Sequence, residues 1–446
     1  MYSRLYGFAR RRIGPGHRVI QRSLLELERS QWLPPAELAE RQLGKIRDLV
    51  GYACENVPFY RELYRRAGVH PRDIRTFDDF RSLPLLTRDD VKDHRKDLIS
   101  TAYRGEVVEG STSGSTGQPM RYLAEKATSY WSYAAETRCR AWYGVRPGDR
   151  MARFLLALSQ GSGRSWKSRF SDRVRGYRWL DPRNLDESSM GAFADVLLKW
   201  RPRMFRVYPS ALTIFAKYLQ ERGIAGIRPV FIESTGEKVT LSQRRLFEEV
   251  FGAPTVDHYS SLEIYSIAYE CPRGSLHIFE DRYLEVLTDG RAAGPGVTGD
   301  LVLTALNQYA MPFIRYQNGD VGALESAECP CGRGMPVLRE MGGRKSDVFV
   351  TADGQPVHWT GVYLVMMPKH EIYQYQIYQP DRGRVEVSLV CKQDIEISYL
   401  ERIRRELQPL FGEAMHITVK RVDDLPASAS GKRLFLRSDV NPGSSL

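Results

Sequence analysis

The segment GSTSGSTGQPM, which begins at Gly110, is the first stretch of this 446-residue chain whose residue types could do chemistry. Seven consecutive small residues, 110–116, can leave backbone amides and hydroxyls pointing into a concavity, which suits phosphate oxygens. No Lys-Ser/Thr pair follows the glycines, so the segment is not a Walker loop. Composition alone is equally compatible with a flexible Ser/Gly linker. The segment therefore predicts either a phosphate-binding loop or a linker.

A second set of residues has the chemistry of metal ligands. Cys271 lies six residues before His277, and Cys329 and Cys331 follow in the segment ECPCGRG. Cysteine and histidine are ligands of tetrahedral Zn²⁺ sites, and the glycines after Cys331 suit a tight turn around a metal. No open ligand position is evident, so the pattern predicts a structural zinc site rather than a catalytic one. The alternative is free thiols and a polar histidine.

Composition narrows the class of protein. Hydrophobic residues make up 42% and charged residues 27% of the chain, as in ordinary folded soluble proteins. No apolar run approaches the roughly 18 residues that a membrane helix requires. The basic segment MYSRLYGFARRRIG lacks the apolar stretch of a signal peptide. Six cysteines in a chain this long do not make a disulfide framework, so we expect a cytoplasmic location.

The net charge of +11 is concentrated in places, above all in residues 161–180, which hold six Arg or Lys against one Asp. Such a patch favours an anionic partner: nucleic acid, a phosphate-rich cosubstrate or anionic lipid. No nucleic-acid-binding motif accompanies the charge, so we expect no nucleic-acid partner. Peripheral association with a membrane or a biosynthetic complex stays open, and a solvated basic surface explains the charge equally well.

The elements that must position these residues change in character along the chain. Residues 22–67 are expected to be helical, because apolar residues recur at helical spacing until Pro58 breaks the pattern. Strand–helix units follow at 204–223 and 229–252, and residues 255–259 begin another strand. This alternation predicts an α/β fold with parallel sheets.

After about residue 345 the pattern is different. The segments QYQIYQ and VEVSLV alternate like paired strands, residues 398–410 form an amphipathic pattern, and HITVKRV predicts a further strand. We therefore expect a large, multi-layer N-terminal α/β domain over residues 1–344, whose first 100 residues or so are helical. A small α+β C-terminal lid domain would follow over residues 345–446.

Six motifs, taken in order, carry a family resemblance. STSGSTGQP resembles the phosphate-binding loop of the adenylate-forming superfamily, which holds acyl-CoA synthetases, firefly luciferase and peptide-synthetase adenylation domains. The other five are STGEKVT (234–240), DHYSSLE (257–263), GDLVLTALNQYAMPFIRYQNGD (299–320), GRKSDVF (343–349) and LPASASGK (425–432). The segments YACENVPFYRELYRRAG, SLPLLTRDDVK and VYPSALTIFAKYL resemble phenylacetate–CoA ligases and their capsule-biosynthesis relatives of the CapK type. The resemblance covers nearly the whole chain and makes residues 1–344 the adenylation domain.

The resemblance implies a role for each matching residue. Glu263 would hold Mg²⁺, Asp320 would accept hydrogen bonds from both ribose hydroxyls, and Lys432 would contact the reacting carboxylate and the bridging phosphate oxygen. Arg344, just before the hinge, would also reach the ribose, and Asp257 would contact the adenine amino group. The remaining nucleotide-binding residues are Ser113, Gly114, Ser115, Thr116 and Gly117 at the phosphates, Gly236 and Glu237 beside adenine, and Tyr259 and Ser260 near the α-phosphate.

Two residues depart from the family's motifs, and the residues of the acid pocket are not given by those motifs. Leu262 stands where the family usually has a threonine, and Ser260 stands where it usually has a glycine. Neither change removes a charged catalytic group, so activity is still expected. Candidate pocket residues are Trp131, Tyr133 and Tyr208, which would suit an aryl acid, although core packing is the commoner role of such side chains.

The sequence therefore predicts an AMP-forming ligase with ATP, Mg²⁺ and a structural Zn²⁺. It would join a carboxylic acid to ATP as an acyl-adenylate and pass the acyl group to coenzyme A. One alternative keeps the adenylate and changes the acceptor to an amine, a sugar or a carrier protein in polysaccharide or secondary-metabolite biosynthesis. Another is a non-catalytic scaffold that binds nucleotide.

Overall fold

The computed structural model describes residues 15–112, 120–155, 166–237, 239, 241–344, 349–357, 362, 365–366, 369, 371–391, 395–425 and 436–440. Its N-terminal part is helical, as predicted, but the helical stretch is divided twice. Helix α2 ends at Ser30, α3 begins at Pro35 and α4 begins at Pro58, because proline fits the first helical position and has no amide for a preceding turn. The helices of this part are α2 (Pro15–Ser30), α3 (Pro35–Asn56), α4 (Pro58–Arg66), the 3₁₀ turn η1 (Pro71–Asp73), α5 (Phe77–Arg81) and α6 (Arg88–Asp93).

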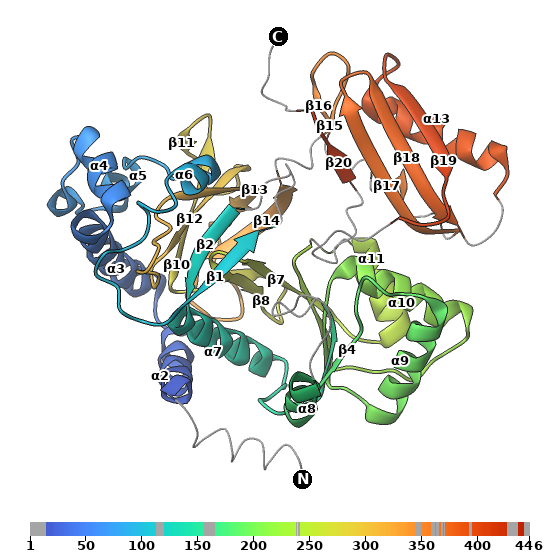
Figure 1. Cartoon of the computed structure of the whole chain (residues 1–446), viewed down its shortest axis with the longest axis horizontal. Coiled ribbons are helices and arrows are strands. Elements are labelled where there is room, and N and C mark those ends of the chain that lie inside the picture. Colours follow the sequence, from blue (N-terminus) through green and yellow to red (C-terminus); the bar gives the residue numbers. More distant parts are fainter. Residues whose placement is uncertain are drawn as a thin grey trace.

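A mixed sheet forms the centre of the large domain (Figure 1). Its strand order is β11-β10-β12-β13-β14-β9-β8-β7-β6-β5-β3-β4. The five strands from β4 to β7 run parallel, which confirms the predicted α/β class, whereas every pair of this sheet from β7–β8 to β10–β11 is antiparallel. The parallel strands are β3 (Met151–Phe154), β4 (Tyr177–Trp179), β5 (Met204–Val207), β6 (Phe231–Thr235) and β7 (Thr255–Ser261). The antiparallel ones are β8 (Tyr265–Glu270), β9 (Leu276–Ile278), β10 (Arg282–Thr288), β11 (Arg291–Ala292), β12 (Gly299–Ala305), β13 (Tyr316–Leu324) and β14 (Val337–Arg344).

Helices cover both faces of the parallel strands. One face packs against α9 (Glu187–Trp200), α10 (Pro209–Glu221) and α11 (Leu241–Phe251) through an apolar core that includes Phe154, Phe205 and Phe215. The other face packs against α7 (Lys126–Trp142) and α2. The ribbon of β1 (Val107–Thr112) and β2 (Met120–Glu125) precedes α7, and α8 (Trp166–Val174) precedes β4. Two covered faces explain why these strands are short apolar runs in the sequence.

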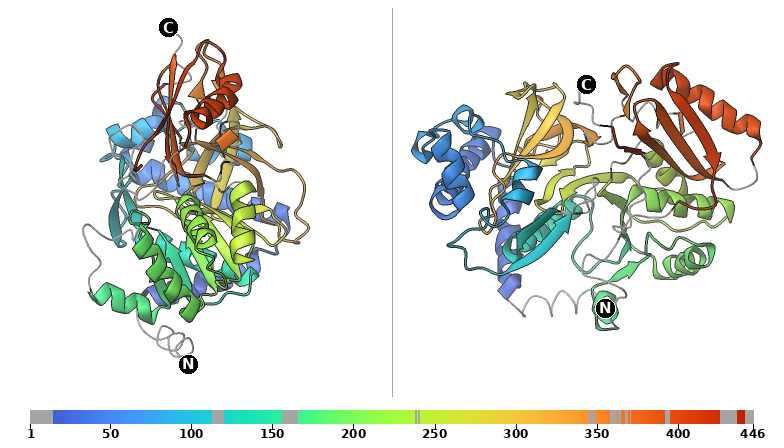
Figure 2. Two further views of the ribbon diagram at one scale, coloured as in Figure 1. Left: turned by 90° about the vertical axis from the view of Figure 1, so that its right-hand side faces the viewer. Right: turned by 45° about the horizontal axis from the view of Figure 1, so that its top comes forward.

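The C-terminal part has its own sheet and its own core. Strand order is β19-β18-β17-β20, and α13 packs on the sheet through Ile403, Leu407 and Phe411. The elements are β15 (Phe349–Val350), β16 (Pro356–Val357), β17 (Ile372–Asp381), β18 (Arg384–Cys391), α13 (Ile397–Phe411), β19 (His416–Arg421) and β20 (Leu436–Ser438). The predicted paired strands and helix are confirmed. Figures 1 and 2 show this sheet at the opposite end of the molecule from α3 to α6. The domain boundary expected after residue 344 falls outside the described residues and stays a prediction.

Among the helices of the described ranges, none is both long enough and apolar enough to cross a membrane.

Candidate functional site

The candidate site lies where the parallel strands β5, β6 and β7 end. Residues that follow these ends include Tyr208 after β5, and Gly236 and Glu237 after β6. The sheet changes from parallel to antiparallel pairing at β7 and β8. Ligands of open α/β sheets bind outside the carboxyl ends of the strands where the chain order switches. The topology therefore places the motifs STGEKVT and DHYSSLE at the edge of the sheet where a ligand is expected.

Short polar contacts fix the turn after β6. The carboxylate of Glu237 accepts hydrogen bonds from the backbone N and the Oγ of Ser210, both at 2.9 Å, at the N-terminus of α10. Gly236 has φ 76°, a left-handed conformation that glycine adopts without strain. Thr235 Oγ1 lies 3.0 Å from Ser260 Oγ, which joins the ends of β6 and β7. Hydrogen bonds thus hold the ends of β6 and β7 and the start of α10 together, and the roles of Gly236, Glu237 and Ser260 at the nucleotide stay predictions.

Asp320 is the centre of a second group of contacts. Its Oδ2 accepts hydrogen bonds from Tyr259 Oη and from Asn318 Nδ2, each at 2.6 Å. Asn318 Nδ2 also lies 2.8 Å from Tyr259 Oη, and its Oδ1 accepts from the backbone N of Asp320 at 3.0 Å. Burial, followed by the charge of Asp320, raises the pKa of Tyr259 well above its usual value, so the phenol stays a donor. In the ladder of β13 and β14, Arg344 pairs with Asp320.

This cluster contains one residue that sequence reasoning missed. Asn318 lies two residues before Asp320 on β13, and both side chains are buried. The period of two along a strand was the available signal, because residues i and i+2 share a face.

Glu263 lies in the turn between β7 and β8, and only 4% of its surface is exposed. Tyr316 Oη lies 3.4 Å from its Oε1, and Gln308 Nε2 donates to its backbone carbonyl at 2.9 Å. Within the described ranges, no Lys or Arg forms an ion pair with this carboxylate. A buried carboxylate without a cationic neighbour is suited to a divalent cation, because it otherwise bears an uncompensated charge.

Asp257 differs from the other predicted nucleotide contacts. Its Oδ2 accepts from Arg244 Nη2 at 2.9 Å, and the same nitrogen donates to Glu270 at 2.7 Å. The Asp257 carboxylate is thus held on the side of α11. Its role at adenine stays a prediction.

The three predicted pocket residues occupy different environments. Trp131 is buried in the core, where its ring makes an edge contact with Phe279 at 5.9 Å and Arg282 stacks over it at 4.6 Å. This packing agrees with the alternative that the sequence left open. Tyr133 on α7 and Tyr208 at the start of α10 are half-buried, and burial raises the pKa of Tyr208 to about 12.

Several predicted residues lie outside the described residues. These are Ser113, Gly114, Ser115, Thr116, Gly117 and Lys432. For Arg344 the structure describes the strand position but not the side chain.

A network of buried ion pairs lies beneath this edge of the sheet, and the sequence did not predict it. Arg140 of α7 binds Glu233 of β6 through Nε at 2.8 Å and Nη2 at 3.0 Å. Arg206 of β5 binds Glu136 through Nη1 at 2.7 Å, and Arg140 donates to the same carboxylate at 2.7 Å. Burial opposes charge here, but Arg206 and Arg140 outweigh it and lower the pKa of Glu136 to about 2. The network fixes α7 to the strands that carry the site.

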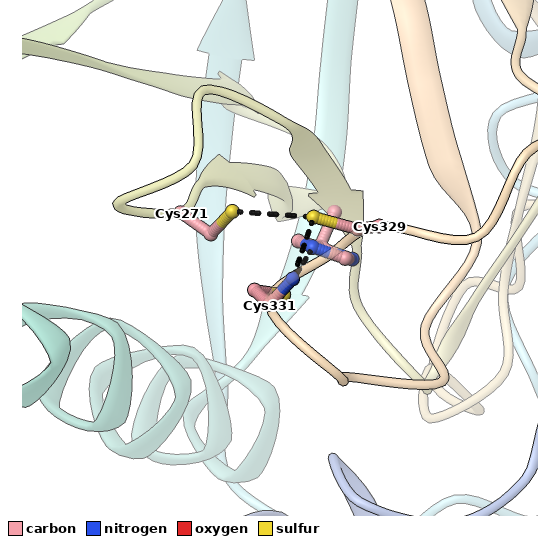
Figure 3. A group of neighbouring side chains, drawn as sticks. Cys271, Cys329 and Cys331 are labelled. Atoms are coloured by element: carbon pink, nitrogen blue, oxygen red, sulfur yellow. Dashed lines mark hydrogen bonds between the residues drawn. The ribbon is translucent and has the colours of Figure 1, made fainter.

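The four predicted zinc ligands come together in a separate cluster, of which Figure 3 labels the three cysteines. Their ligand atoms all lie within 4.8 Å of one another. Cys271 follows β8, His277 is in β9, and Cys329 and Cys331 are in the connection between β13 and β14. Cys271 Sγ and Cys329 Sγ are 3.7 Å apart, close to the roughly 3.8 Å edge that two 2.3 Å Zn–S bonds span in a tetrahedron. A disulfide would bring the sulfurs to about 2.05 Å.

The surroundings of these ligands are also those of a metal site. His277 Nδ1 lies 3.0 Å from the carbonyl of Met335, which leaves Nε2 directed at Cys331 Sγ, 3.2 Å away. Burial lowers the pKa of His277, which favours the neutral imidazole that binds metals. The backbone N of Cys331 donates to Cys329 Sγ at 3.5 Å.

Comparisons with known proteins find similar sequences and similar folds. Residues 349–439 match the family model of the CapK C-terminal domain. The phenylacetate-coenzyme A ligase of Thermus thermophilus is 27% identical over 437 residues, which cover 90% of this chain and 96% of that protein. The corresponding ligase of Escherichia coli is 24% identical over 416 residues, covering 88% and 93%.

Solved structures share the fold. A 2-hydroxyisobutyryl-CoA ligase in its postadenylation state, in complex with R3-HIB-AMP, superposes with a TM-score of 0.75 at 19% identity over 92% of each chain. The same ligase in its thioesterification state, with 2-HIB-AMP and CoA, gives a TM-score of 0.61 at 19% identity over 92% of each chain. The chain is thus similar over most of its length to phenylacetate-coenzyme A ligases, its residues 349–439 match the CapK C-terminal domain, and it shares its fold with a 2-hydroxyisobutyryl-CoA ligase.

Proposed function

We propose that this protein uses ATP to convert a carboxylic acid into an acyl-adenylate and then transfers the acyl group to coenzyme A. The observation that carries the proposal is the pair of buried carboxylates, Asp320 and Glu263, at the carboxyl edge of the sheet. One is held by Tyr259 and Asn318, and the other has no Lys or Arg ion-pair partner within the described ranges. The relatives named above are ligases of this kind.

In the first half-reaction, a carboxylate oxygen of the acid attacks the α-phosphorus of ATP. The bond from that phosphorus to the bridging oxygen breaks, and pyrophosphate leaves with the electron pair. Because anions approach one another, binding and charge compensation supply most of the catalysis. Mg²⁺ held by Glu263 would supply positive charge at the phosphates.

Residues of this chain would bind the ribose, the phosphates and the reacting carboxylate. Asp320 accepts hydrogen bonds from the two ribose hydroxyls, with its orientation fixed by Tyr259 and Asn318. Arg344 would reach the same ribose, and residues 113–117 would bind the phosphates. Lys432 would bring a point charge to the reacting carboxylate and the bridging oxygen.

We further propose that the C-terminal domain, residues 345–446, rotates between the two half-reactions. Rotation would withdraw Lys432 and admit the thiol of coenzyme A, which attacks the acyl carbon and releases AMP. The contact of this domain with α10 supports the idea: Lys217 Nζ donates to the Ile372 carbonyl at 2.7 Å, a polar contact that is easily exchanged for water.

The cluster of Cys271, His277, Cys329 and Cys331 would hold a structural Zn²⁺. The four protein atoms would fill a tetrahedral zinc site and would leave no coordination position for a substrate. Its function would be to fasten the β13–β14 connection to β8 and β9.

The test is ATP–pyrophosphate exchange with a panel of aryl, fatty and sugar acids, with and without coenzyme A. Acid-dependent exchange supports adenylation, and a thioester product supports coenzyme A as acceptor. If exchange occurs without thioester, hydroxamate trapping with amines and carrier proteins identifies the alternative acceptor. A protein that does not bind ATP contradicts the proposal.

The Lys432→Ala variant sharpens this test. We expect it to lower exchange by roughly 10²- to 10³-fold, as loss of a preorganised charge contact does, while thioester formation from preformed acyl-AMP changes little. Lys420→Ala, at an exposed position of β19 in the same domain, is the matched control. Equal loss of both half-reactions in Lys432→Ala contradicts the assignment.

A further inference from the structure

A row of charged side chains crosses the parallel strands on the face that α7 covers. Arg153 of β3 pairs in register with Arg206 of β5, which pairs with Glu233 of β6. His258 of β7 continues the row, with Nδ1 3.6 Å from Glu233 Oε1. Glu136 of α7 lies over the row and binds Arg206.

The charges in this row do not balance. Arg140 and Arg206 share the carboxylates of Glu136 and Glu233, whereas Arg153 is a third guanidinium. In the part of the chain that the structure describes, no carboxylate lies within the 4.0 Å ion-pair distance of Arg153; its Nε contacts Met151 Sδ at 3.3 Å. Burial, helped by repulsion from Arg206 and Arg140, lowers the pKa of Arg153 to about 10, which leaves the group charged at neutral pH. A largely buried cation with no carboxylate at ion-pair distance is costly even though Glu136 attracts it from farther away, and an anionic ligand would lower that cost.

Two aromatic rings orient this guanidinium. Arg153 lies 4.0 Å from the ring centroid of Tyr177 and 4.9 Å from that of Trp179, both on β4. Stacking on ring faces fixes the plane of the group, and the N–H donors in that plane are suited to a carboxylate that accepts two parallel bonds.

Arg153 is one residue from the carboxyl edge of the sheet. The next residue, Phe154, ends β3 at the carboxyl edge, and its carbonyl accepts a hydrogen bond from the backbone N of Tyr208 at 3.1 Å. Tyr133 is one helical turn before Glu136 on α7. On β6 the next residue of this face is Thr235, which contacts Ser260 at the nucleotide side.

We propose that Arg153 binds a second anionic group of the acid, so that the substrate is a dicarboxylic acid or an acid with an equivalent distal anion. The proposal rests on the proposed function and names the substrate class of that same site. Strands β3 and β7 are three interstrand spacings apart, roughly 14 Å, and the guanidinium stacks on rings of β4, on the side of β3 away from β7. The test therefore varies the length of the acid.

The experiment compares diacids with neutral isosteres of the same length. Adipic, suberic and terephthalic acids are each assayed beside their monoamides in ATP–pyrophosphate exchange. We expect the native protein to prefer at least one diacid by about 10- to 100-fold in kcat/KM, the value of a charge-assisted bidentate contact. Arg153→Met should lose that preference and change the monoamide rate by less than about threefold.

Arg153→Lys should keep part of the preference, because lysine retains the charge but lacks the two parallel N–H donors of the guanidinium. Arg175→Met, at an exposed position just after α8, is the matched control and should behave as the native protein. Thermal unfolding of each variant checks the fold. An equal preference in native protein and folded Arg153→Met overturns the proposal.

Two further measurements distinguish this proposal from its alternatives. Acids with a distal phosphonate or sulfonate identify which anion Arg153 prefers. If Arg153→Met raises only the KM for coenzyme A, the anion belongs to the cosubstrate and the proposal fails. Calorimetric binding of suberate without ATP tests the subsite even where no acid supports exchange. If native protein binds suberate more tightly than Arg153→Met does, the subsite is supported although the proposed function fails. Equal binding by the two proteins overturns the subsite.

Discussion

The two ends of β8 carry two different kinds of site. Glu263 precedes the strand at the carboxyl edge of the parallel sheet, and Cys271 follows it at the other edge, a strand length of about 20 Å away. At the Cys271 end, four ligand atoms lie within 4.8 Å of one another, all in the described residues. At the Glu263 end, the predicted site still needs residues 113–117 and Lys432 from elsewhere in the chain.

The difference follows from what each site does. A structural metal site is complete when its polyhedron is filled, so folding of a few neighbouring elements is sufficient. A site that binds two or three substrates in turn must stay open and be completed by parts that move. We therefore expect changes at the two ends of β8 to affect different properties of the protein.

Among the changes at the two ends of β8, Asp320→Ala should produce the largest difference between its effect on catalysis and its effect on bound zinc. Removing the carboxylate deletes the two charge-assisted hydrogen bonds expected to the ribose and leaves Tyr259 Oη and Asn318 Nδ2 without their acceptor. We expect kcat/KM for ATP to fall by roughly 10²- to 10³-fold in exchange assays, with bound zinc unchanged. Asp195→Ala, on the exposed surface of α9, is the control. Loss of zinc in Asp320→Ala would show that the two ends are coupled.

The sequence predicted the elements better than it predicted their cross-strand neighbours. Periodicity identified the strand–helix units and the paired strands of the C-terminal domain, because each pattern is local. The zinc ligands were found because Cys and His are rare and chemically distinctive. The ion network was missed, since Arg206 and Glu233 are single charges within the strands MFRV and FIEST, and their pairing depends on strand register. A charge inside a buried strand was the only local signal.

Cys329→Ser tests the other end of the strand. Metal binding coupled to folding makes each ligand a contributor to stability, so we expect less bound zinc and a free energy of unfolding lower by on the order of 3 kcal/mol. Below the unfolding temperature, ATP–pyrophosphate exchange should change by less than about threefold, because no substrate contacts the metal. Cys54→Ser, at a half-buried cysteine outside the cluster, is the control.

Elemental analysis and thermal unfolding, with and without a chelator, measure the outcome. If native protein contains no zinc, or if Cys329→Ser binds as much zinc as native protein does, the cysteine cluster is not a zinc site. Unchanged zinc together with lost exchange would move the cysteine cluster into the catalytic region.

The smallest effect is expected at Leu262, in the turn directly before Glu263. The side chain is 38% exposed, so a smaller residue leaves no cavity in the core. Leu262→Thr would supply the hydroxyl that the family usually has near the α-phosphate, and one added hydrogen bond of about 1 kcal/mol predicts a roughly fivefold gain in the rate of adenylation. Leu262→Val has the shape of threonine without the hydroxyl and isolates its contribution. A gain shared by both variants would assign the effect to the size of the side chain, whereas a loss in Leu262→Thr alone would indicate that the leucine contacts an apolar part of the acid.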